Sequence, residues 1–292
     1  MLDAPAEMDA RAAVTRTPED RAAAIAAALA ATRDRIAEAA RAAGRAAGSV
    51  RLIAVSKRMP EVDLRAALAA GQRDFAENYA QELRDKRAAF AAGSAAILGG
   101  SAHAVDFPPR PPVTVLTPPD LRWHFIGPLQ SNKLKYLVGQ VALIHTVDSP
   151  ELVAQIDLRL GPRPGATPSA RDDPASRTQD CLVQVNLAGA ARQSGVPPDR
   201  LGGLLDAFAG SPRVACIGLM LIPPQSAADD PTAARRHFAT LRELAERERR
   251  VARPNVDLRE LSMGMSHDFP LAIAEGATMV RVGTAIFGAR PR

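Results

Sequence analysis

Short runs of β-branched and aliphatic residues alternate along this chain with longer segments rich in alanine, arginine and glutamate. Short apolar runs bounded by polar or turn residues predict buried strands, and the longer segments predict helices. We expect strands near Leu52–Ser56, Asp74–Asn78, Trp123–Gly127, Ala142–Val147, Leu182–Leu187, Val214–Leu221, Glu260–Met265 and Met279–Val282. A regular alternation of strand and helix indicates a parallel sheet, and eight strands are what a (β/α)8 barrel requires. The predicted fold is therefore α/β, a single TIM barrel.

The predicted helices separate these strands, with one more at the amino-terminal side. That first helix is an alanine-rich stretch from Pro18 to Ala47, which has high helix propensity and stops before Gly48. The others are expected at Glu61–Ala70, Ala80–Ala91, Asn132–Val138, Pro150–Leu160, Pro197–Ala209, Thr232–Arg250 and Phe269–Glu275.

The domain organisation follows from where this rhythm stops. Residues 1–17 lack periodicity and are predicted to be a disordered tail, and residues 18–292 are predicted to form one domain. Two segments interrupt the alternation, at about 92–120 and 161–180, and both are rich in proline with glycine, serine or threonine. That composition favours surface insertions over packed elements.

Composition and charge exclude several classes of protein. The chain of 292 residues is 47% apolar and 24% charged, which is typical of a globular protein. No apolar stretch approaches the roughly 20 residues of a spanning helix, and no secretory signal is evident, so we expect a cytoplasmic protein. The net charge of +5 comes from arginines interspersed with acidic residues, so we do not expect nucleic-acid binding. The two cysteines, Cys181 and Cys216, are expected to be buried in strands.

The candidate chemistry begins with Lys57, which stands where the first predicted strand ends. Read alone, it is equally consistent with a lysine that extends to solvent or with an amine that attacks a carbonyl. Near the carboxyl terminus, Ser262–Ser266 and Arg281–Gly288 follow predicted strands and supply the small residues that let a backbone approach a phosphate. In a TIM barrel such strand ends meet at one face. An amine beside a phosphate site suggests pyridoxal phosphate (PLP).

Five motifs make the chain resemble a known family. They are Ala54–Lys57, Phe75–Glu82, Trp123–Lys133, Leu261–Ser266 and Val280–Arg290. Together they look like the pyridoxal phosphate homeostasis proteins, and the resemblance extends from about the first helix to the carboxyl terminus. It implies a barrel of the alanine racemase N-terminal type that holds PLP as a Schiff base.

By the same resemblance, each cofactor contact has a candidate. The Schiff base is expected on Lys57, with Arg281 facing the pyridine nitrogen. Asn78 is a candidate partner of the ring or its phenolic oxygen, and Met220 is a candidate for packing on the ring face. The phosphate is expected on Ser262, the amides of Gly264 and Gly283, and Thr284. No catalytic residue and no metal site are expected, and His124 and His145 are interpreted as hydrogen-bonded barrel residues.

The function that the resemblance implies is PLP binding for vitamin B6 homeostasis, without robust catalysis. An arginine cannot accept a proton from the pyridine, so the ring stays neutral and is a weaker electron sink. The chain also shows no counterpart of the racemases' second domain, so we expect a monomer with apo PLP enzymes as candidate partners. Whether it is an enzyme stays open. The alternative is a small PLP-dependent amino-acid racemase or lyase, with Tyr79 or His124 as the opposing base.

Two positions depart from the family pattern. Where relatives usually carry a glutamate and a second lysine before Ser-Gly, this chain has Ala188–Gly195, with Gln193 before Ser194. His267 replaces the usual acidic residue after Ser266. Any role of the second lysine is therefore in question for this chain.

Overall fold

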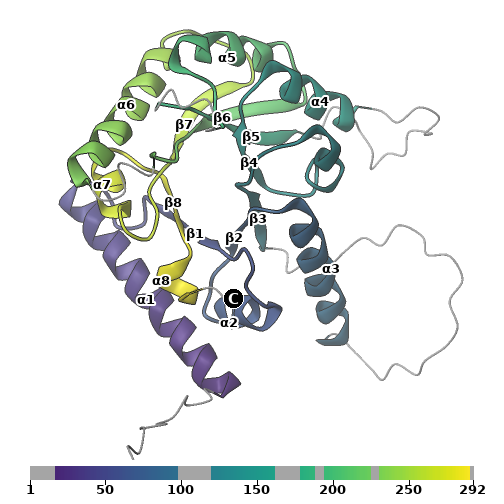
Figure 1. Ribbon diagram of the computed structural model, residues 1–292, viewed down its shortest axis with the longest axis vertical. Coiled ribbons are helices and arrows are strands. Elements are labelled where there is room, and N and C mark those ends of the chain that lie inside the picture. Colours follow the sequence, from purple (N-terminus) through teal and green to yellow (C-terminus); the bar gives the residue numbers. More distant parts are fainter. Residues whose placement is uncertain (1–16, 98–119, 162–177, 188–193, 225–229, 290–292) are drawn as a thin grey trace, which may run out of the picture.

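The eight predicted strands are present and close into one barrel. The computed structural model describes residues 17–97, 120–161, 178–187, 194–224 and 230–289. All neighbouring strands are parallel and follow sequence order around the barrel, which β8 closes against β1 (Figure 1). The strands are β1 (Arg51–Val55), β2 (Asp74–Glu77), β3 (Arg122–Phe125), β4 (Leu143–Val147), β5 (Gln179–Gln184), β6 (Val214–Met220), β7 (Val256–Ser262) and β8 (Met279–Val282). The TIM-barrel prediction is confirmed.

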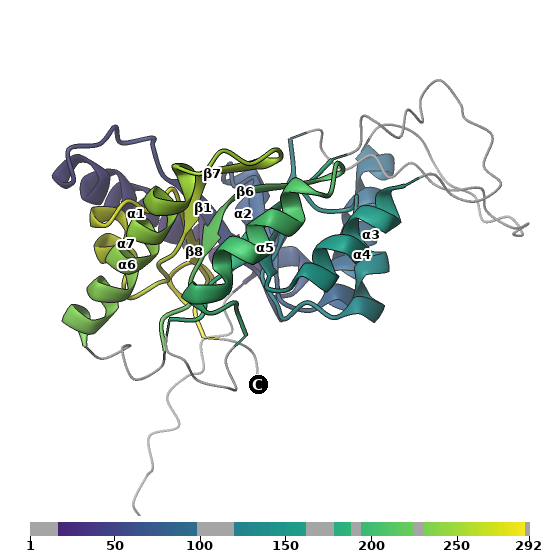
Figure 2. The same cartoon turned by 90° about the horizontal axis from the view of Figure 1, so that it is seen from above.

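Helices surround the barrel on the outside (Figure 1). The α-helices are α1 (Pro18–Ala42), α2 (Glu61–Ala69), α3 (Ala80–Ile97), α4 (Pro150–Leu160), α5 (Leu201–Ala209), α6 (Pro231–Arg249), α7 (Phe269–Ala274) and α8 (Thr284–Phe287), and two 3-10 helices are η1 (Ser131–Tyr136) and η3 (Pro198–Arg200). Helices α1, α6 and α7 lie on one side of the barrel, and α3 and α4 lie on the other (Figure 2). No helix within the described ranges is long and apolar enough to cross a membrane.

The first helix begins where the sequence predicts and ends earlier. Thr17 caps it: its hydroxyl accepts from the amide of Asp20, whose carboxylate accepts from the Thr17 amide, a capping box that satisfies two helix-end donors. The helix stops at Ala42, not Ala47, because Gly44 adopts φ +69° and turns the chain. Arg45 then donates to two carbonyls of the α7–β8 region, which ties this turn to the barrel.

Several further expectations can be compared with the structure. The segment predicted as a helix at Asn132–Val138 is the short 3-10 helix η1. The predicted tail and both predicted insertions fall mainly on residues outside the described ranges, as does Gln193. Helix α3 continues to Ile97, six residues past its predicted end at Ala91.

The barrel interior has its own apolar cluster, separate from the larger core between strands and helices. It contains Ile53, Ala76, Leu143, Leu182, Ile217, Met220 and Met279, with Val55 packed against them. Side chains alternate across a strand, so Ile53 and Val55 face the interior and Lys57, two positions on, continues that face. The strand period therefore directs Lys57 over the open end of the barrel.

One glycine lets the ends of β2 and β3 approach each other. A Cβ at Gly127 would lie 1.9 Å from the carbonyl oxygen of Asn78, well inside van der Waals contact. The close approach brings the Asn78 loop against the chain that follows β3. Any side chain at Gly127 must therefore displace backbone.

Gly127→Ala is accordingly expected to destabilise the fold by roughly 2 kcal/mol or more, because a backbone clash is among the mechanisms with large effects. Gly203→Ala is the matched control: it lies in α5 with no atom within 4 Å of the added Cβ, and alanine there should stabilise the protein by up to about 1 kcal/mol. Urea unfolding measures both. Equal stability of the Gly127 variant and the wild type would contradict the close approach.

Candidate cofactor-binding site

The carboxyl ends of the first and last strands bring Lys57 beside the glycine-rich carboxyl-terminal motif. Strand β1 pairs with β8 in the register Ala54 to Val282. As a result, a small hollow has Lys57 on its wall together with Gly283 and Thr284. Its other lining residues are Val55, Met59, Phe287 and Gly288. Two parts of the predicted site, separated by most of the chain, are thus brought together.

The peptide groups on both sides of Lys57 are fixed by a buried ion cluster. The carbonyl of Ser56 accepts a hydrogen bond from Lys86 Nζ at 2.7 Å, and the amide of Arg58 donates to Glu82 Oε1 at 2.5 Å. Lys86 and Glu82 are themselves joined, at 2.8 Å. Arg58 has φ +61°, a left-handed conformation that non-glycine residues adopt only when their surroundings impose it. The backbone turn that carries Lys57 is therefore fixed by hydrogen bonds on both sides of the residue.

Glu77 completes this cluster, to which we refer as the Lys86 clamp (Ser56, Glu77, Glu82 and Lys86). Its Oε1 accepts from Lys86 Nζ at 2.7 Å and from the Ser56 hydroxyl at 2.7 Å. The carboxyl group is fully buried, and burial raises its pKa to about 7 despite the lysine beside it. Its Oε2 has no hydrogen-bond partner. The clamp lies on the outer side of the sheet, opposite the face that Lys57 continues.

Arg281 is the most deeply placed cation of the site. It is 3% exposed, and its Nη1 donates to Ser262 Oγ at 2.8 Å while Nη2 donates to the Leu221 carbonyl at 2.9 Å. Burial lowers the pKa of this guanidinium to about 10, which leaves it protonated at neutral pH. These contacts use two of the five N–H groups of an arginine.

Behind Ser262 lies a pair of histidines that the sequence interpretation treated only as barrel residues. Ser262 Oγ is 2.9 Å from His145 Nδ1, and His145 Nε2 is 3.0 Å from His124 Nδ1. His124 Nε2 is in turn 3.0 Å from Asp74 Oδ1. Both rings are essentially inaccessible to solvent. The interpretation of both as hydrogen-bonded barrel residues agrees with this geometry, and His124, enclosed on both nitrogens, is no longer a candidate for the opposing base.

Charge and burial set the protonation of this polar chain. Burial alone would raise the pKa of Asp74, but hydrogen bonds from Arg122 and His124 lower it to about 2. Burial lowers the pKa of His124, although Asp74 opposes that shift. The pKa of His145 is lowered further, by burial, by His124 and by Arg281. At neutral pH the two histidines are therefore neutral, between a carboxylate and a guanidinium.

The loop after β7 is shaped to approach the turn after β8. Gly264 has φ +92°, and a Cβ there would lie 2.7 Å from the Cβ of Ala272, so the glycine lets this loop pack against α7. Beyond it, the hydroxyl of Ser266 is 3.1 Å from that of Thr284 and accepts from the amide of Ala285 at 3.4 Å. Ser266 and Thr284 thus meet, and the carbonyl of Gly264 accepts from the amide of Arg281 at 3.0 Å. Ser266 was absent from the predicted phosphate set; its hydroxyl, two residues after the glycine, was the available signal.

The remaining predicted residues occupy different depths. Met220 is fully buried in the interior apolar cluster, beneath the open end of the barrel. Asn78 is half-buried, follows β2, and lies against Gly127. Both come from strand ends at the same face as Lys57. The predicted set therefore converges on one end of the barrel, where Met220 at the end of β6 pairs with Ser262 at the end of β7.

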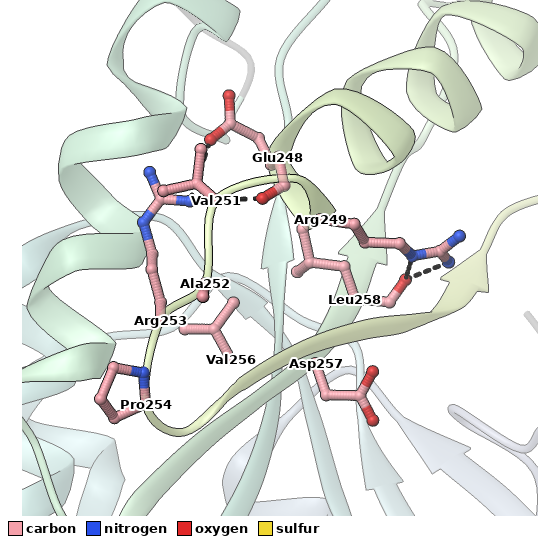
Figure 3. Close-up of a pocket in the computed structure, with 9 residues that line it drawn as sticks. All are labelled: Glu248, Arg249, Val251, Ala252, Arg253, Pro254, Val256, Asp257 and Leu258. Carbon is pink, nitrogen blue, oxygen red and sulfur yellow. Dashed lines mark hydrogen bonds and ion pairs between the residues drawn. The ribbon is translucent and has the colours of Figure 1, made fainter.

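A separate hollow of about 520 Å³ lies between the end of α6 and the start of β7, at the opposite end of the barrel (Figure 3). Its charged residues already have partners: Arg253 binds Asp206 and Glu248, and Arg249 donates to the Leu258 carbonyl. None of the predicted cofactor ligands lines it. Although it is larger than the hollow at Lys57, its chemistry offers no amine for a carbonyl.

Comparisons with known proteins agree with the motifs. The model of the family described as alanine racemase, N-terminal domain, matches residues 28–291. The pyridoxal phosphate homeostasis protein of Pseudomonas aeruginosa is 39% identical over 256 residues, which cover 88% of this chain and 91% of that protein. The protein of the same name from Escherichia coli strain K12 is 36% identical over 265 residues, covering 90% and 95%. A solved structure of PipY from Synechococcus elongatus, with PLP bound, superposes with a TM-score of 0.67 at 34% identity, covering 90% and 100%.

The buried histidines predict a measurable acid sensitivity. In the unfolded chain a histidine binds a proton near its ordinary pKa of about 6.5, whereas the lowered pKa of His124 keeps it neutral in the folded state. The unfolded state then binds more protons, so stability falls as pH drops below about 6.5, by up to about 1.4 kcal/mol per pH unit for one histidine. Urea unfolding between about pH 7.5 and pH 5.5 should show a shallower loss for His124→Gln than for wild type.

Glu77 is present in both proteins, so its opposite contribution cancels in that comparison. Its raised pKa means that the folded state binds the extra proton between the ordinary value and about 7, which favours folding on acidification. Identical pH slopes for the wild type and the His124 variant would contradict a neutral, buried His124.

Proposed function

Because this chain belongs to the alanine racemase N-terminal domain family, and within it to the pyridoxal phosphate homeostasis proteins, we propose that it binds PLP for vitamin B6 homeostasis. The cofactor is held as a Schiff base on Lys57, and the protein has no robust catalysis of its own. The observation that carries the proposal is the meeting of Lys57, Gly283 and Thr284 around one hollow, with Arg281 buried in the adjoining strand. An amine, a small-residue loop and a fixed cation are the contacts that an aldehyde-bearing pyridine phosphate needs.

The amine of Lys57 supplies the covalent contact. It condenses with the aldehyde carbon of PLP: a carbon–nitrogen double bond forms, the carbonyl oxygen leaves as water, and no oxidant or reductant is required. The Lys86 clamp supports this role because it fixes the Ser56 carbonyl and the Arg58 amide on either side of the lysine. A reacting group held in place loses less freedom when it binds. PLP itself, when bound, supplies the electrophilic carbon and the conjugated ring.

The phosphate is assigned to the loops after β7 and β8. The amides of Gly264 and Gly283 are the candidate backbone donors to it, since glycine has no side chain that could obstruct them, and the hydroxyl of Thr284 lies beside that of Ser266. Barrels of this type commonly bind phosphate at the ends of their last two strands. We include Ser266 in this set. The side chain of Ser262 is already hydrogen-bonded to Arg281 and His145. Ser262 is therefore a weaker candidate for a phosphate ligand than the other residues of the predicted set.

The ring is assigned to Arg281, Asn78 and Met220. A guanidinium donates hydrogen bonds and accepts none, so the pyridine nitrogen opposite Arg281 stays unprotonated and the ring withdraws electrons weakly. That electronic state suits storage and transfer of the cofactor better than chemistry at an amino-acid α-carbon. Met220 belongs to the interior apolar cluster at the end of β6, and Asn78 is half-buried after β2.

The wider role rests on the names of the relatives. Those names give PLP homeostasis. We propose in addition, as the family resemblance of the sequence implies, a cytoplasmic monomer that holds PLP and passes it to apo PLP enzymes. The alternative, a small racemase or lyase, retains one candidate base: Tyr79 is 44% exposed at the rim, and the guanidinium of Arg58 lies 5.7 Å from its ring centroid. His124 no longer supports that alternative, because both of its nitrogens are engaged.

Titration with PLP tests the site directly. The wild-type protein is expected to develop a visible absorption band, and Lys57→Ala is expected to lose it because no other amine occupies that position. Lys133→Ala is the matched control, since Lys133 lies on η1 and outside the assigned site; it should keep the band. Reduction with borohydride followed by peptide mapping should place the added mass on Lys57. A band that persists in Lys57→Ala, or one that Lys133→Ala removes, would contradict the assignment.

A further inference from the structure

Five side chains form one continuous run of hydrogen bonds through the barrel interior. In order they are Arg281, Ser262, His145, His124 and Asp74, with successive distances of 2.8, 2.9, 3.0 and 3.0 Å. We propose that this run is a relay of hydrogen bonds that all donate in the same direction, from Arg281 toward Asp74. In it, the two histidines hold the Ser262 hydroxyl as a fixed acceptor for Arg281. The positioning residues for the Arg281 guanidinium are then His145, His124 and Asp74. The contact of that guanidinium with the cofactor ring rests on the proposed function.

The direction of the relay follows from its two ends. The Asp74 carboxylate can only accept, so the adjoining Nε2 of His124 must carry its proton. A neutral imidazole has one N–H, so Nδ1 of His124 is an acceptor and His145 Nε2 is the donor to it. Repeating the step, Nδ1 of His145 accepts from the Ser262 hydroxyl. Each tautomer is therefore determined by the neighbour before it.

At the other end, this order decides what Ser262 can do. Its single proton is given to His145, and a lone pair accepts from Arg281 Nη1. Arginine has no acceptor, so the contact requires Ser262 to present a lone pair. The relay thus keeps the hydroxyl from rotating its proton toward the guanidinium. It also keeps that proton from a phosphate, which leaves Ser266 and Thr284 as the hydroxyls of the phosphate loop.

The Asp74 end is anchored outside the barrel interior. Asp74 takes a two-pronged contact from Arg122, at 2.7 Å and 2.6 Å, and Arg122 reaches solvent. This fork holds both carboxylate oxygens and keeps the group ionised. The positive charges of Arg51 and Arg122 also lower the pKa of His124, and so disfavour its protonated form. The relay consequently runs from the buried Asp74, paired with the exposed Arg122, to the buried Arg281.

One competing arrangement uses the same atoms. If His124 carried two protons, it would donate to both Asp74 and His145, and His145 would then donate from Nδ1 to Ser262. Ser262 would accept twice and its own proton would be free. The two arrangements differ in the position of the proton on His145, which makes them distinguishable by experiment.

The test is a long-range ¹H–¹⁵N correlation spectrum of cofactor-free protein labelled at its histidines, at about pH 7.5. The proposal expects His124 and His145 each to be neutral and protonated at Nε2 alone. His124→Gln and His145→Gln assign the signals. An Nδ1–H tautomer or a doubly protonated ring at either position would overturn the relay. This readout does not depend on PLP binding, so it stands apart from a failure of the proposed function.

The second measurement asks whether the relay acts on the ring contact. Gln at position 124 can keep a donor to Asp74, but its carboxamide oxygen does not take the place of the ring Nδ1. His145 Nε2 should therefore lose its fixed acceptor, and the His145 proton should redistribute between its nitrogens. Pyridoxine 5′-phosphate, which has no aldehyde and cannot bond to Lys57, is expected to bind His124→Gln roughly 2- to 10-fold more weakly, the effect of one lost hydrogen bond. Inhibition of that binding by inorganic phosphate should be unchanged, because phosphate uses the loops and not Arg281.

Gln179→Met serves as the control, because it removes buried hydrogen bonds at the start of β5 outside the relay. It should leave the His145 tautomer and the analogue affinity at wild-type values. If His124→Gln weakened inorganic phosphate as much as the analogue, the effect would be general loosening, and the positioning role would be overturned. If wild type failed to bind the analogue while both tautomers were as expected, the proposed function would fail and the relay would remain.

Discussion

The site is organised around a guanidinium buried inside a barrel. Arg281 is 3% exposed, and a charge so placed must be surrounded by oriented acceptors or it destabilises the fold. Two acceptors are supplied by Ser262 and the Leu221 carbonyl, which come from β7 and the end of β6. Three consecutive strands therefore close around one side chain. The two histidines and Asp74 continue this hydrogen-bonded network across the barrel. They are needed because a serine hydroxyl is a fixed acceptor only where its own proton is donated to another group.

The two networks of the site use the two faces of the same sheet. On β2, Asp74 and Ala76 face the interior, whereas Phe75 and Glu77 face outward, as the strand period requires. Asp74 thereby joins the relay that ends at Arg281, and Glu77 joins the Lys86 clamp that holds the peptides around Lys57. One short strand thus orients both the cation assigned to the ring and the amine assigned to the aldehyde. Closure of the barrel by β1 against β8 then sets the two strands that carry these groups side by side.

Much of this could be predicted from the sequence, and the exceptions have physical causes. The strands, and the position of Lys57 at the end of the first, were predictable because short apolar runs bounded by polar residues are local signals. The relay was not, because His124, His145 and Ser262 come from three strands whose contact depends on barrel closure. Ser262 and Ser266 are equivalent by composition, and only the structure shows the first engaged with Arg281 and the second beside Thr284. The early end of α1 has a local cause, the left-handed conformation of Gly44, which the alanine-rich pattern around it does not reveal.

A crystal structure of the protein with PLP bound tests the central claim most directly. The account predicts continuous electron density from Lys57 Nζ to the cofactor and the phosphate between the loops of Gly264 and Gly283. It also predicts that Arg281 stays hydrogen-bonded to Ser262 while another of its N–H groups meets the ring nitrogen. Cofactor bound elsewhere, or an Arg281 that leaves Ser262 to reach the phosphate, would contradict it.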